Sequence, residues 1–144
     1  RVLKLQVAHY LPELVPANER AAALALLSAK QHADGGWCVR DFSALNDWHF
    51  EISDTVRKLV TGLPDAAQPE SDAYMTAFAI VLMRQNDMPV QDERIQRGLA
   101  WLKKEQRVSG RWWMHSLYRG NYHYITYIAT AQAMKAFDLC GELK

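Results

Sequence analysis

Two short stretches of the chain combine residue types that can move protons. Asp72 and Tyr74 stand two positions apart at the start of an apolar run, where a carboxyl and a phenol could act as acid or base. The stretch Arg119-Gly120-Asn121-Tyr122-His123-Tyr124 gathers a guanidinium, an amide, an imidazole and phenols. Such groups neutralise developing charge and abstract protons. The catalytic residues stay unknown from the residue types alone, and Asp72, Tyr74 and His123 are weak candidates.

The metal-binding and redox residue types show no motif spacing. Cys38 and Cys140 lie far apart without a C-x-x-C pattern, so we expect ordinary thiols, and a disulfide between them stays open. The other histidines are scattered, which favours surface or loop roles: His9, His32, His49 and His115. Zinc normally takes three or four Cys, His or carboxylate ligands. We therefore expect no metal site and no cofactor.

The composition is that of one ordinary globular domain. The chain has 144 residues, of which 49% are hydrophobic and 23% charged, and its net charge is +1. It has no basic block, which disfavours a nucleic-acid partner. It also has no apolar run of about 18 residues, so we expect no transmembrane segment.

A motif of the pattern Q-x3-G-x-W occurs twice, with an offset of 75 residues. Each copy ends a helix-forming run and is followed by an apolar run that contains Thr-Ala. A glutamine at a helix end can bond free backbone groups, the glycine permits a positive φ, and the tryptophan can cover the turn. The motif residues therefore have an expected structural role: Gln31, Gly35, Trp37, Gln106, Gly110 and Trp112.

The elements that position these residues are predicted to be helices. Periodicity indicates helices over 17–31, 72–86, 93–106 and 122–139, with 38–70 as an irregular connection. Ser71 and Asp92 are the expected N-caps of the second and third, and Gly141 suits a left-handed end for the last. The 93–106 run is amphipathic, whereas 72–86 and 122–139 are apolar nearly all round. We expect two layers of helices, with the apolar helices covered on both sides, and no strand.

The second motif copy resembles the QW repeat of the squalene–hopene cyclase family. Arg97-Gly98, Trp101-Leu102, Gln106, Gly110 and Trp112 carry this resemblance over residues 97–112, and 17–37 is a looser copy. Protein prenyltransferase β subunits have the same helical-hairpin repeat. The resemblance implies an all-α fold of the α/α-toroid type, with 1–144 as one segment. Because a full ring needs about six hairpins, the segment would be a partial ring or a fragment completed by a longer or partner chain.

The resemblance also implies that the usual chemistry is missing. Cyclases protonate an alkene with the middle Asp of D-x-D-D-T-A, which corresponds here to Asp72-Ala73-Tyr74-Met75-Thr76-Ala77. A phenol at the acid position, with an ordinary pKa near 10, cannot replace that carboxylic acid. In prenyltransferases an Asp-x-Cys and a His hold zinc, whereas Tyr74 replaces the Cys and Tyr124 the His, with His123 one position off.

What remains is an apolar, aromatic site that would suit an isoprenoid or other apolar ligand. The expected ligand-binding residues are Asp72, Trp113, Tyr118, Tyr122, His123, Tyr124 and Tyr127. The alternative is a non-catalytic scaffold or interaction module with the same fold. A third alternative is a toroid polysaccharide lyase, because such enzymes use the residue types gathered in 119–124.

Overall fold

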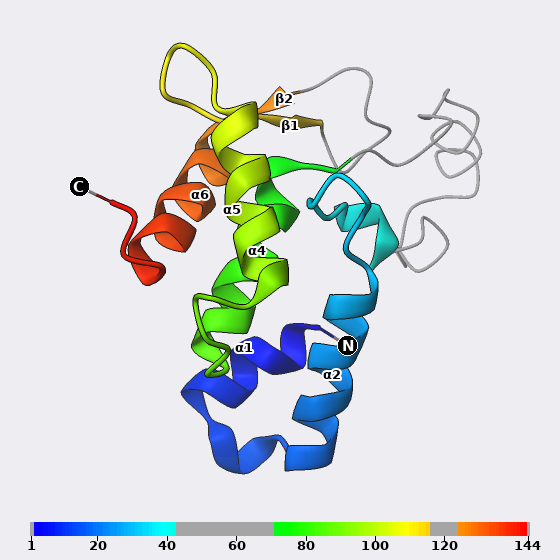
Figure 1. Ribbon diagram of the computed structural model, residues 1–144. Coiled ribbons are helices and arrows are strands. Elements are labelled where there is room, and N and C mark those ends of the chain that lie inside the picture. Colours follow the sequence, from blue (N-terminus) through cyan, green and yellow to red (C-terminus); the bar gives the residue numbers. More distant parts are fainter. Residues whose placement is uncertain (1, 43–70, 116–123, 144) are drawn as a thin grey trace, which may run out of the picture.

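The computed structural model describes residues 2–42, 71–115 and 124–143 (Figure 1). This part of the chain is all-helical except for one two-residue ladder. Its five α-helices are α1 (Leu3–Tyr10), α2 (Ala17–Ala29), α4 (Ala73–Gln85), α5 (Glu93–Glu105) and α6 (Tyr127–Leu139). A 3₁₀ turn, η1 (Pro12–Leu14), follows α1. A second one, η2 (Val39–Asp41), lies after α2, shortly before residues 43–70, which are not described. None of the described helices is long and apolar enough to cross a membrane.

Helix α4 lies at the centre of the core. Ten of its 13 residues are buried, in agreement with the prediction of an apolar helix covered nearly all round. It packs against α6, α5 and α1. In Figure 1 the start of α4 lies at the same end of the molecule as the start of α6.

Helix α5 is amphipathic and covers α4. Its apolar stripe, Ile95, Leu99 and Leu102, is almost fully buried, as its spacing predicts. Asp92 caps the helix, and its carboxylate accepts the backbone N–H of Arg94 at 3.0 Å. Gly98 brings the two helices together, because a Cβ at this position would lie 3.0 Å from the Ile80 side chain.

Helix α6 has the same length as α4 but a different exposure. Ala129, Ala133, Ala136 and Phe137 are buried, whereas Tyr127, Ile128 and Met134 are exposed. The prediction that both apolar helices are covered on both sides is therefore wrong for α6 within the described residues. Gly141 ends α6 with φ +71, as predicted.

Two local predictions near the helix starts are also wrong. The last helix begins at Tyr127 and not at 122, because Tyr124–Ile125 (β2) pairs antiparallel with Met114–His115 (β1), although no strand was expected. The N-cap of α4 is Asp72, whose carboxylate accepts the N–H of Met75 at 2.6 Å. Ser71 lies one residue too early to cap and points to other partners.

Candidate functional site at the start of α4

The first Q-x3-G-x-W motif forms a tight turn between α2 and α5. The indole N–H of Trp37 donates to the carbonyl of Leu27 in the last turn of α2 at 2.8 Å, beside the Lys30 N–H that the same carbonyl accepts at 3.3 Å. The Gln31 amide donates to the carbonyls of Gly35 at 2.8 Å and Arg94 at 2.9 Å. The turn is thus bonded both to the helix that it ends and to α5.

The second motif makes the same bonds within its own turn. The indole N–H of Trp112 donates to the carbonyl of Leu102 at 2.7 Å, and the Gln106 amide donates to that of Gly110 at 3.0 Å. Gly110 also has a positive φ, +77, compared with +96 at Gly35. The turns differ in their surroundings, because Gln106 and Gly110 are exposed.

Each turn is tied to an apolar helix through a threonine. The Thr76 hydroxyl accepts the N–H of Trp37 at 2.9 Å and donates to its carbonyl at 3.3 Å. Thr130 on α6 does the same for Trp112, at 3.1 and 3.2 Å. Apart from the bond of Gln31 to Arg94, the Gln, Trp and Thr positions therefore make equivalent bonds in both copies.

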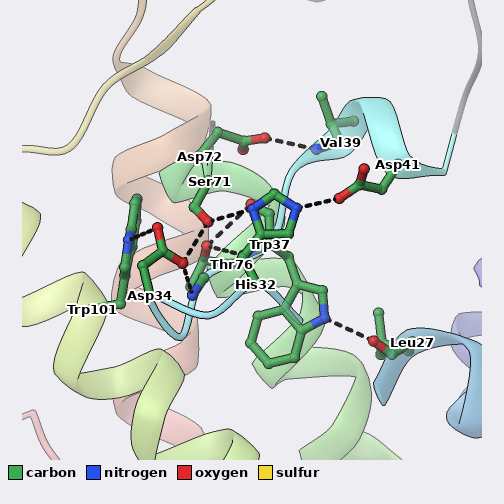
Figure 2. Close-up of polar contacts among 11 residues, drawn as sticks. Leu27, His32, Asp34, Trp37, Val39, Asp41, Ser71, Asp72, Thr76 and Trp101 are labelled. Carbon is green, nitrogen blue, oxygen red and sulfur yellow. Dashed lines mark hydrogen bonds and ion pairs between the residues drawn. The ribbon is translucent and has the colours of Figure 1, made fainter. Parts of the chain in front are cut away.

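A polar cluster exists at the first turn alone among the described residues (Figure 2). His32 Nε2 lies 2.7 Å from the carboxylate of Asp41, and its Nδ1 lies 3.0 Å from the Ser71 hydroxyl. Ser71 donates to Asp34 at 2.8 Å, and the Trp101 indole N–H reaches the second oxygen of Asp34 at 3.1 Å. The cluster joins the first turn, η2, the start of α4 and α5.

This order of serine, histidine and aspartate is also that of an acyl-transfer relay, in which the histidine takes the serine proton. Here the single Ser71 hydroxyl hydrogen is shared between His32 and the Asp34 carboxylate, which competes with the base. The Ser71 side chain is also pressed against Gly36, since a Cβ there would lie 2.7 Å from the hydroxyl oxygen. We therefore interpret the cluster as one that positions the start of α4 and not as one that activates Ser71 as a nucleophile.

Asp72 itself is engaged as a structural acceptor. Its carboxylate accepts the N–H of Met75 at 2.6 Å and that of Val39 at 2.8 Å. Burial raises the pKa of Asp72 to about 6, against the lowering effect of these N–H groups. Burial, and then the nearby Asp72 charge, also raises the pKa of Tyr74 above its ordinary value. Neither group is a strong acid here.

Asp34 behaves in the opposite way. Partial burial raises its pKa, but hydrogen bonds from the Gly36 N–H, Ser71 and Trp101, together with His32, outweigh that effect. The pKa of Asp34 is therefore lowered. The carboxylate remains an acceptor for the cluster at neutral pH.

The Asp72 pKa predicts a pH dependence of stability. Since its folded pKa of about 6 exceeds the ordinary 3.8, the stabilising contribution is complete below 3.8 and is lost as the pH rises through 6. For a single carboxyl group, this difference in pKa corresponds to a contribution of up to about 3 kcal/mol to the free energy of unfolding. The measurement is the free energy of unfolding in urea of the wild type minus that of Asp72→Asn. We expect this difference to fall by up to about 3 kcal/mol between pH 4 and pH 7.5. A difference that is constant over this range would contradict the assignment.

The other predicted site residues are only partly brought together. Trp113 is half-buried beneath Arg107, whose guanidinium carbon lies 5.4 Å from the ring centroid. Tyr127 is 84% exposed at the start of α6. Tyr124 lies in β2 and not on a helix. Tyr118, Tyr122 and His123 lie outside the described residues.

The described residues contain no group of three or more His, Cys, Asp or Glu side chains that could hold a metal ion. Cys38 and Cys140 are both free thiols. Burial raises the pKa of the Cys38 thiol to about 11, so it is a poor nucleophile at neutral pH.

The cluster itself was not predicted from the sequence. His32 was placed among scattered surface histidines, and Asp34, Asp41 and Ser71 were given no site role. A signal was present in the alignment of the two motif copies: His32 and Asp34 stand where the second copy has Arg107 and Ser109. These two positions differ between the copies, and both take part in the cluster.

No protein-family model matches the chain, and no curated protein is similar to it at a significant level.

Proposed function

We propose that this chain is a segment of a QW-type α/α toroid that binds an isoprenoid or other apolar ligand without protonating it. The observation that carries the proposal is the state of the acid position at the start of α4. Tyr74 stands there, and the neighbouring Asp72 carboxylate is held by two backbone N–H groups as a helix cap. A site with this arrangement has a residue at the position of the cyclase acid, but that residue is a phenol, which is too weak an acid to protonate an alkene.

The matching bonds of the two motifs support the toroid part of this proposal. Trp37 and Trp112 each donate to a helix carbonyl ten residues earlier, and each is bonded through its backbone to a threonine on an apolar helix. Helices α1, α4 and α6 contact one another in succession, while α2 packs on α1 and α5 on α4. Such an alternation is typical of helical-hairpin repeats.

Aromatic and aliphatic side chains at the starts of α4 and α6 support the ligand. Tyr74 is half-buried and stacks on Phe78, with ring centroids 5.8 Å apart. Ile128, at the equivalent position of α6, is exposed, as is the preceding Tyr127. Exposed apolar groups at one end of two adjacent helices suit a long hydrocarbon.

Titration with farnesol, followed by tryptophan fluorescence, tests the ligand. Because Tyr74 would contribute apolar contact area, we expect Tyr74→Ser to weaken binding about tenfold. Tyr10→Ser is the matched control, since Tyr10 is 60% exposed on α1, away from the starts of α4 and α6. Absence of binding, or an equal loss in both variants, would contradict the proposal.

The non-catalytic scaffold remains the second candidate. It is favoured by the exposed apolar face of α6, which suits a contact with another protein segment. It predicts no farnesol binding and an intact fold in both variants. The polysaccharide lyase alternative rests on 119–124, of which 119–123 lie outside the described residues.

A further inference from the structure

Helices α4 and α6 are structurally equivalent elements in this chain. Both have 13 residues, both bond a motif tryptophan through the threonine at their fourth position, and Thr130 follows Thr76 by 54 residues. Both also end alike, in a residue of positive φ: Asp87 after α4 and Gly141 after α6. Positions on the two helices can therefore be compared one by one.

The comparison shows that α6 lacks a neighbour that α4 has. Tyr127, Ala131 and Met134 form an exposed face of α6. The equivalent residues on α4 are Ala73, Ala77 and Ile80, and all three are buried. Ile80 is in contact range of Gly98, so α5 covers this part of the α4 face. Nothing in the described part of the chain takes the place of α5 beside Met134.

The two motif turns show the same difference independently. In the first turn, Arg97 of α5 donates to the carbonyls of His32 and Ala33 at 2.9 and 3.0 Å. A Cβ at Gly35 would lie 2.8 Å from the Arg97 carbonyl oxygen, so this turn is in tight contact with α5. The equivalent carbonyls of the second turn belong to Arg107 and Val108, and Val108 is fully exposed.

The second turn is correspondingly open. A Cβ at Gly110 would meet nothing within 4 Å, and the Gln106 amide has no counterpart of the bond that Gln31 gives to Arg94 among the described residues. In Figure 1 this yellow loop projects beyond the helices at the top. At the first motif copy, α5 contacts both the turn and the equivalent α4 face. We therefore treat the open turn and the exposed α6 face together and call them the α6 docking face: Gln106–Gly110, Tyr127, Ala131 and Met134.

We propose that the α6 docking face binds an amphipathic helix with the pattern of α5, supplied by another polypeptide segment. The helix would present an apolar stripe equivalent to Ile95, Leu99 and Leu102 to α6, with a small residue at the Gly98 position beside Met134. An arginine at the Arg97 position would donate to the carbonyls of Arg107 and Val108. Arg97 itself donates in this way to the carbonyl of His32, which like that of Arg107 also accepts a glycine N–H of its own turn. The surface repeats the established α4–α5 interface, and the inference does not depend on an apolar ligand.

A chimera tests the proposal directly. Residues 1–141 are followed by a second copy of residues 88–112, because Gly141 is the equivalent of Asp87. We expect the amides of the added helix to exchange with solvent at least tenfold more slowly than in the isolated 88–112 peptide. Met134→Glu in the chimera should remove at least tenfold of this protection. Leu3→Glu, on the exposed face of α1, is the control and should leave it unchanged.

Three outcomes would overturn the proposal. The first is exchange of the added helix at the rate of the free peptide. The second is protection that stays intact in the Met134→Glu chimera, when the circular dichroism melt of this variant matches that of the parent chimera. Leu99→Glu in the added copy tests the same contact from the added helix. The third is dimerisation of the unmodified chain with protection of the α6 amides, which would assign the face to a second copy.

Discussion

Replacing Trp37 with alanine should lower the free energy of unfolding by about 4 kcal/mol, as expected for truncating a fully buried tryptophan. Its side chain is 0% exposed. The indole N–H donates to the carbonyl of Leu27, so its removal leaves a cavity and takes away the shorter of the two hydrogen bonds of that carbonyl, which also accepts the Lys30 N–H at 3.3 Å. The backbone bonds to Thr76 would remain, which limits the damage to the packing around the turn. Urea unfolding followed by circular dichroism measures the loss.

Two matched variants separate the causes. Trp37→Phe keeps most of the buried ring but loses the N–H, and should cost about 1–2 kcal/mol. Trp113→Ala removes a half-buried tryptophan outside the motif positions and should cost clearly less than Trp37→Ala. A loss below about 1 kcal/mol for Trp37→Ala, or equal losses at the two tryptophans, would show that the motif does not hold the turn.

The two motif glycines should respond differently to the same change. Gly35→Ala places a Cβ 2.8 Å from the carbonyl oxygen of Arg97, in a residue with φ +96. Both the left-handed backbone and the displacement of α5 cost free energy, together about 3 kcal/mol. Gly110→Ala has the backbone cost alone, about 1 kcal/mol, because its φ is +77 with open space around it.

Thermal or urea unfolding of both glycine variants measures this difference. Equal losses at Gly35 and Gly110 would mean that the first turn does not bear on α5 as described. The same two variants can be made in the chimera with the added α5 copy. If Gly110→Ala there costs as much stability as Gly35→Ala, although it costs less in the parent chain, the result would further support the α6 docking face.

The helices were predictable where their signals are local. The stripe of α5, its Asp92 cap and the Gly141 end of α6 depend on residues within one or two turns, and these predictions are confirmed. The start of α6 was misplaced because β1 and β2 pair residues that are nine and eleven positions apart, His115 with Tyr124 and Met114 with Ile125. Helical periodicity over 122–139 does not contain that information.

The candidate site was predictable only in part, for a similar reason. Asp72 and Tyr74 were identified through the resemblance of Asp72–Ala77 to the cyclase acid motif at the start of an apolar helix. His32, Asp34 and Ser71 were missed because 37 to 39 residues separate the serine from its partners, and no spacing rule relates them. Ser71 was predicted to be the N-cap of α4. Because Asp72 is the N-cap instead, the Ser71 hydroxyl is available to bond His32 and Asp34 in the cluster.

The central claim is that the segment binds an apolar isoprenoid and does not protonate it. Incubation with squalene in deuterated water, followed by extraction and mass spectrometry, tests binding and protonation together. We expect squalene to be retained with the protein and recovered unchanged, without deuterium, because in the proposed correspondence with cyclases Tyr74 stands in place of the acid, and Asp72 caps α4. A cyclised product that carries deuterium, or no retained lipid at all, would contradict this account.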